Sequence, residues 1–75
     1  MHEYYTVTVR RKIPNKDSIE LEFTLHENFD FNFDRKFDTF DMAEDAGHDF
    51  MKTDPLAVKF KIECVQTHSV TGWLS

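Results

Sequence analysis

Alternation of apolar and polar side chains runs through three stretches of this chain, residues 4–10, 18–25 and 56–65. A period of two is typical of β-strands that bury one face. The inward positions that it predicts are Tyr5, Val7 and Val9, then Ile19, Leu21, Phe23 and Leu25, and finally Val58, Phe60, Ile62 and Cys64. Pro14 and Asn15 separate the first two stretches, so we expect a turn that joins them as an antiparallel hairpin.

The period changes to about 3.6 residues over residues 38–52, which is typical of an amphipathic helix. Its apolar positions fall in one stripe, formed by Phe40, Ala43, Gly47, Phe50 and Met51. Asp38 or Thr39 is expected to cap the N-terminus. Pro55 is expected to end the helix, because the residue before a proline avoids helical backbone angles.

The predicted order of elements is two strands, one helix and one strand. A helix with a single apolar stripe covers one face of a three- or four-stranded sheet, so we expect a small two-layer α+β domain spanning residues 1–75. We place the third strand beside the first, which makes the sheet mainly antiparallel. Residues 66–75 extend the last strand, add a short fourth strand or form a tail.

Composition narrows the class of protein. Cys64 is the only cysteine, which excludes an internal disulfide, and no stretch reaches the length needed to span a membrane. The four histidines do not follow a zinc-site spacing, and two glycines are too few for a phosphate-binding loop. We therefore expect a cytoplasmic protein that is not an enzyme and carries no cofactor.

The charge is concentrated in the middle of the chain. Residues 27–54 carry nine acidic and three basic side chains, a net charge of −6, whereas the remaining residues carry six basic and five acidic side chains, a net charge of +1. A total of −5 argues against direct binding of nucleic acid, because neutralisation of phosphates supplies much of that affinity.

Residues 28–41, NFDFNFDRKFDTFD, allow three interpretations. The first is a metal site, since oxygen-bearing side chains stand at positions 1, 3, 5, 9 and 12 of a loop that resembles the EF-hand, namely Asp30, Asn32, Asp34, Asp38 and Asp41. The match departs from that family at position 6, where Arg35 replaces glycine, and at position 12, where aspartate replaces glutamate. Metal binding is therefore the least favoured interpretation.

The second interpretation is structural. Phe29, Phe31 and Phe33 alternate with polar residues, so one bent strand continuing from residues 18–25 would place all three rings on one face. Phe37 would then pack at the start of the helix, as apolar residues before a cap often do. The third interpretation, compatible with the second, is that some of these rings stay exposed and anchor a protein partner.

Acidic residues form a row along the predicted helix. Asp38, Asp41, Asp45 and Asp49 lie opposite the apolar stripe, although like charges four residues apart destabilise a helix. A solvated face is the simplest explanation, but retention of this repulsion favours a basic partner. The residues expected to bind it are Asp34, Asp38, Asp41, Glu44, Asp45, Asp49 and Phe33.

Two functions remain open. The first is a small binding module, an inhibitor or adaptor, whose acidic helix docks on a basic surface of a larger protein, for example one that handles nucleic acid. Full mimicry of DNA is less favoured, because charges about 5 Å apart along the helix are sparser than the ~1.7 Å spacing of a duplex. The second is a structural subunit that self-assembles, as a homodimer for example, through a sheet edge or the C-terminal residues.

In length and order of elements the chain is similar to small phage-encoded proteins that inhibit host nucleic-acid enzymes. The likeness concerns the type of fold and no motif carries it, so it implies no particular function.

Overall fold

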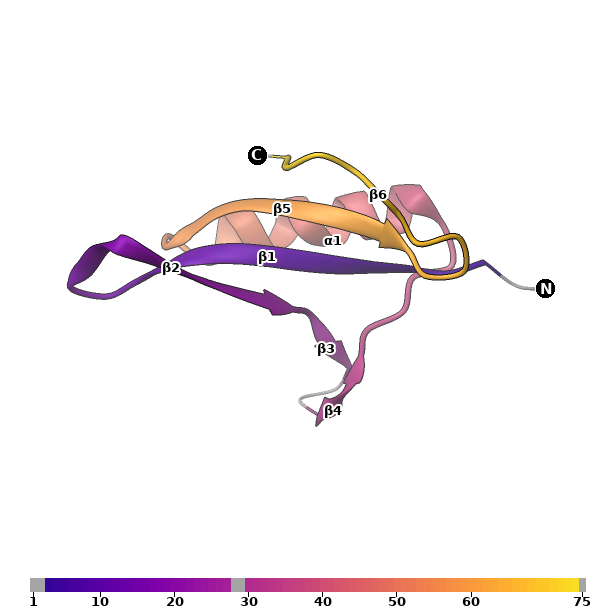
Figure 1. Ribbon diagram of the computed structural model, residues 1–75, viewed down its shortest axis with the longest axis horizontal. Helices are drawn as coiled ribbons and strands as arrows, with labels where there is room; N and C mark the ends of the chain where they lie inside the picture. The colour runs from indigo at the N-terminus through magenta and orange to yellow at the C-terminus, as the bar shows by residue number, and fades with distance from the viewer. Residues whose placement is uncertain (1–2, 28–29, 75) are drawn as a thin grey trace.

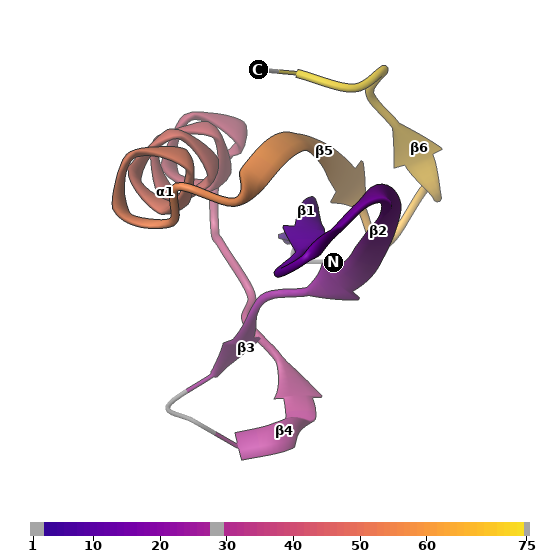
Figure 2. The same cartoon turned by 90° about the vertical axis from the view of Figure 1, so that its left-hand side faces the viewer.

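A four-stranded antiparallel sheet with one helix on one face forms the body of the protein (Figures 1 and 2). The computed structural model describes residues 3–27 and 30–74, and the side chains of these residues other than 17, 27 and 30–33. The strand order is β2-β1-β5-β6, formed by β1 (Tyr5–Ile13), β2 (Lys16–Thr24), β5 (Ala57–Cys64) and β6 (Ser69–Val70). This is the predicted α+β class.

The predicted placement of the third strand beside the first is confirmed. Val9 of β1 pairs with Phe23 of β2 on one side and with Phe60 of β5 on the other, and both pairings are antiparallel. The turn between β1 and β2 includes Asn15, whose φ of 66° lies in the left-handed region that asparagine tolerates better than most residues.

The core lies between the inner face of the sheet and helix α1 (Phe40–Thr53). Its largest fully buried side chains are Val7, Val9, Phe60 and Ile62. Phe37 and Ala43 complete the buried cluster from the helix side. The inward positions predicted for β1 are therefore correct, as are Phe60, Ile62 and Cys64 of β5; Val58 is only partly buried, and Ala57 packs against the core in its place.

Local side-chain chemistry sets the ends of α1. Of the two predicted caps, Thr39 takes the role: its hydroxyl accepts a hydrogen bond from the Met42 backbone N–H at 3.2 Å. Asp54 ends the helix, and its N–H donates to the Phe50 carbonyl at 3.0 Å. Phe37, two residues before the cap, is buried, as predicted.

The prediction that Ile19 and Leu21 point into the core is wrong, since these side chains are 47% and 48% exposed. Leu21 pairs with Arg11, and Arg11 contacts Asp54 at the C-terminal end of α1. The hairpin continues past this point, beyond the reach of the helix (Figure 1). Nothing in the helix layer covers Ile19 or Leu21, whereas Phe23 and Leu25 pack against the core.

The residues after β5 run back along its edge. Strand β6 pairs with β5, and Leu74 makes a further bridge to Phe60 with hydrogen bonds of 2.8 and 2.6 Å. Of the three alternatives for the C-terminal residues, the short fourth strand is therefore the one that forms.

Strands β3 (His26–Glu27) and β4 (Asp30–Asp34) form a second, two-stranded sheet, here called the arm. The arm projects from the edge of the main sheet (Figure 2). Residues 30–34 do form a strand, as the structural interpretation predicts, but the prediction that they continue residues 18–25 in one bent strand is wrong, because β4 folds back on β3. Phe29 lies outside the described residues, as do the side chains of Phe31 and Phe33.

Candidate functional site

The outward side of α1 is acidic. Asp41, Asp45 and Asp49 are exposed on the side of the helix away from the buried Ala43 and Gly47, and the partly exposed Glu44 lies on the flank of that side. Within the described part of the chain, no ion pair or hydrogen bond engages these four carboxylates. We call this set the acidic face. Asp38, just before the helix, is also exposed and has an interaction of its own.

The glutamates Glu20 and Glu22 of β2 behave differently. Arg10 Nε lies 3.3 Å from Glu20 Oε1 and 4.0 Å from Glu22 Oε2. Lys61 Nζ lies 3.5 Å from Glu22 Oε1. The carboxylates of Glu20 and Glu22 thus have basic partners within the fold, whereas those of the acidic face do not.

Asp54 is the most firmly held carboxylate among the described residues. Its Oδ2 accepts a hydrogen bond from Arg11 Nε at 2.7 Å, and its Oδ1 accepts from Arg11 Nη2 at 3.3 Å and from the Leu56 N–H at 2.9 Å. The Arg11 hydrogen bonds lower the pKa of Asp54 below its ordinary value, against a smaller opposing effect of burial. This pair ties β1 to the junction between α1 and β5, and its role is structural.

Basic side chains gather on the face of the sheet opposite to α1. Arg10, Lys59 and Lys61 alternate with the buried Val9, Phe60 and Ile62, and their charged groups lie 5.7, 5.1 and 4.9 Å from the centroid of the Trp73 ring. These cation–π contacts hold the C-terminal residues on the sheet. This sheet face also carries Glu20 and Glu22, which contact Arg10 and Lys61, so it mixes both signs of charge, whereas the outward side of α1 is acidic.

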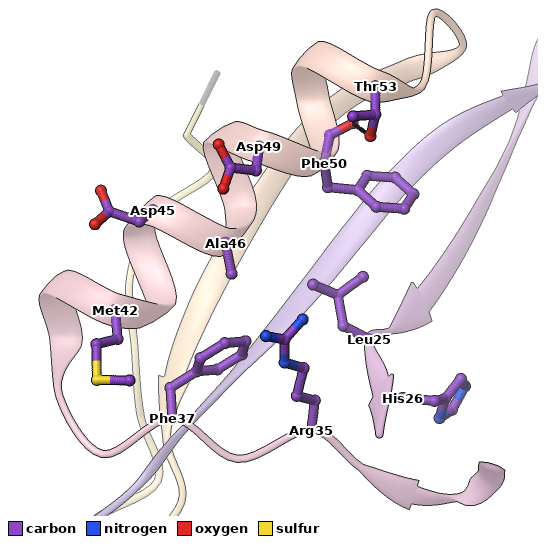
Figure 3. A pocket seen from close by; sticks show the side chains of 10 residues that line it. All are labelled: Leu25, His26, Arg35, Phe37, Met42, Asp45, Ala46, Asp49, Phe50 and Thr53. Carbon is purple, nitrogen blue, oxygen red and sulfur yellow. Dashed lines mark hydrogen bonds between the residues drawn. The ribbon is translucent and has the colours of Figure 1, made fainter. Parts of the chain in front are cut away.

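An open groove of about 460 Å³ lies between α1 and the base of the arm (Figure 3). Its apolar side chains come from both walls: Met42, Ala46 and Phe50 from the helix, and Leu25 and Phe37 from the segments that flank the arm. Phe37 is buried, whereas Leu25, Ala46 and Phe50 are only partly so. The groove therefore offers apolar surface that no other part of the described chain covers.

The two walls of the groove carry opposite charges. Asp45 and Asp49 lie on the helix side, with their carboxylates turned outward at the rim (Figure 3). Arg35 lies on the other wall, where its guanidinium stands 4.9 Å from the centroid of the Phe37 ring. His26 is next to it, with Nδ1 3.8 Å from Asp34 Oδ1. The acidic face thus continues into a groove whose far wall is basic.

The structure brings together only part of the predicted site. Asp41, Asp45 and Asp49 share the outward side of α1 with Glu44 at its flank, but Asp34 lies on β4 beside His26. The side chain of Phe33 lies outside the described residues. Sequence reasoning did not identify Arg35, Leu25 or Ala46 as site residues, because no periodic signal connects them and the groove depends on the direction of the arm.

The segment that resembles an EF-hand loop, residues 30–41, does not form a loop between two helices. Residues 30–34 are a strand, and a helix begins at residue 40. Among the described side chains, no three of the histidine, cysteine, aspartate and glutamate residues come together in a way that would hold a metal ion. Cys64 is buried at an inward position of β5.

Comparison with known proteins gave no match to a family model, to a curated protein or to a solved structure. No helix in the described part of the chain combines the length and the apolar character needed to cross a membrane.

Proposed function

We propose that this protein is a small binding module without catalytic activity, an inhibitor or adaptor, which docks the acidic face of α1 on a basic surface of a larger protein. The observation that carries the proposal is the contrast in pairing. Glu20, Glu22 and Asp54 have basic partners within the fold, whereas Asp41, Glu44, Asp45 and Asp49 have none among the described residues.

The spacing of the acidic face supports this function. Asp41, Asp45 and Asp49 follow one another at intervals of four residues, so each neighbouring pair repels and costs the helix about 0.2–0.5 kcal/mol. A basic partner would remove this cost on binding and would be steered toward the face by its field. Carboxylates that repel one another in the free protein would thus each attract a basic group of the partner in the complex.

Affinity capture from a lysate of the source cells tests the proposal. The wild-type chain is compared with D41K/D45K/D49K, at low and at high salt. We expect the wild type to retain a basic protein at low salt and to lose it at high salt, because screening weakens contacts between exposed charges. The reversed variant should retain nothing specific. Equal retention by both chains would show that the acidic face is not the docking surface.

Self-assembly is the second candidate, and the exposed Ile19 and Leu21 favour it. Both lie on β2, whose outer edge has no partner strand within the described chain, and apolar edge strands invite pairing between copies. Sedimentation of the wild type and of I19T/L21T separates the two functions. A wild-type dimer that the double substitution dissociates supports self-assembly, whereas a monomer at micromolar concentration opposes it.

A further inference from the structure

The groove beside α1 supplies what the acidic face lacks, a place for an apolar side chain. We infer that it receives a segment of the partner protein in which one large apolar side chain lies next to a lysine or arginine. This inference rests on the proposed function and adds the chemistry of the recognised segment. Charge alone would give weak contacts, since exposed ion pairs contribute little affinity, whereas a buried apolar anchor contributes much more.

The groove has the shape for such an anchor. Leu25 and Phe37 face Ala46 and Phe50 across the opening (Figure 3), and a volume of about 460 Å³ falls in the range typical of ligand pockets. Ala46 is the smallest of these side chains, so the helix leaves the most room for an incoming side chain at this position. An incoming apolar side chain would rest there and remove the partly exposed side chains of Leu25 and Phe50 from water.

The charges around the groove define the neighbours of that anchor. Asp45 and Asp49 stand at the helix rim without an ion-pair partner in the described chain, so a basic residue beside the anchor would pair with them. Arg35 on the opposite wall would donate to a carbonyl or carboxylate of the same segment. The acidic rim would repel the phosphates of a nucleic acid, so a polypeptide is the favoured occupant.

Chemical-shift titration of the isotope-labelled full chain tests the inference with three blocked peptides of defined sequence, Lys-Leu-Lys, Lys-Gly-Lys and Glu-Leu-Glu. We expect Lys-Leu-Lys to bind several-fold more tightly than either of the others and to shift the amides of Leu25, Ala46 and Phe50. A46L should abolish the tighter binding of Lys-Leu-Lys relative to Lys-Gly-Lys, because the larger side chain at position 46 fills the groove. Q66L is the matched control, since it adds an apolar side chain at an exposed position away from the groove without changing the charge, and it should keep the tighter binding of Lys-Leu-Lys.

The remaining outcomes separate the two claims. Equal binding of Lys-Leu-Lys and Lys-Gly-Lys along Asp41–Asp49 would overturn the groove inference and leave the acidic docking function intact. Equal binding of Glu-Leu-Glu would overturn the role of the charges and count against both. Shifts of the groove amides that grow with protein concentration alone would overturn the inference in favour of a second copy as the occupant.

Discussion

Arg11 of β1 donates two hydrogen bonds to Asp54 at the C-terminal end of α1, from Nε to Oδ2 at 2.7 Å and from Nη2 to Oδ1 at 3.3 Å. One residue thereby fixes the helix end, the turn into β5 and the central strand. The same contact marks the limit of the helix layer, because the β2 residue paired with Arg11 is the exposed Leu21. The pair also contributes a pH-dependent part of the stability.

The stabilising effect of this pair should be lost in acid. Arg11 holds the pKa of Asp54 below its ordinary value of 3.8, so the folded state binds a proton there less readily than the unfolded state. The contribution is then complete above 3.8 and disappears as the pH falls through the lowered pKa. Urea unfolding of the wild type and D54N at a series of pH values measures this. We expect D54N to be clearly less stable than the wild type near neutral pH, and the difference in free energy of unfolding to vanish in acid. A difference that does not change with pH would refute the stabilising role of the Arg11–Asp54 pair.

Gly47 should not tolerate a side chain. A Cβ built at Gly47 would overlap the ring of Phe60, which is fully buried and has no room to move. In a helix, alanine is normally more stable than glycine by about 1 kcal/mol. Overpacking a core, however, costs about 1–3 kcal/mol, and more where the neighbouring side chains cannot shift. We expect G47A to lower the free energy of unfolding. G72A is the control, because nothing lies within 4 Å of the position, and it should leave stability almost unchanged.

Neutralising the acidic face should stabilise the free protein. Asp45 has a like charge four residues away on both sides, Asp41 and Asp49, so D45N should raise the free energy of unfolding by about 0.4–1 kcal/mol. The gain should shrink with added salt. E20Q, which removes a carboxylate that has a partner, should give no gain. A destabilised D45N would reveal an internal partner of Asp45 and weaken the docking proposal.

Alternation and helical periodicity predicted most of the fold. Most of the buried positions of β1 and β5 follow from period two. The turn at Pro14 and Asn15 predicts the antiparallel hairpin of β1 and β2, and the expected place of the third strand beside the first makes the order antiparallel. Thr39 was one of two possible caps, and only the observed hydrogen bond to the Met42 N–H selects it over Asp38. The direction of the arm could not be predicted, because β3 and β4 are short and pair only with each other within the described residues.

The exposure of Ile19 and Leu21 shows the limit of pattern reasoning. Alternation states which side chains share a face, but not whether another layer reaches them. A helix of 14 residues extends about 21 Å at 1.5 Å per residue, whereas a strand of nine extends about 30 Å. The groove eluded prediction for a related reason, since Leu25, Arg35 and Ala46 meet only through the turn of the chain into the arm.

The affinity of the captured partner for two matched variants tests the central claim most directly. D41N/D45N/D49N and E20Q/E22Q/E63Q each remove three negative charges, the first from the acidic face and the second from the main sheet. We expect the first to weaken binding about tenfold or more, a change of at least ~1.4 kcal/mol, and the second to leave the dissociation constant nearly unchanged. Equal losses in both variants, or a loss confined to the second, would contradict docking through the acidic face of α1.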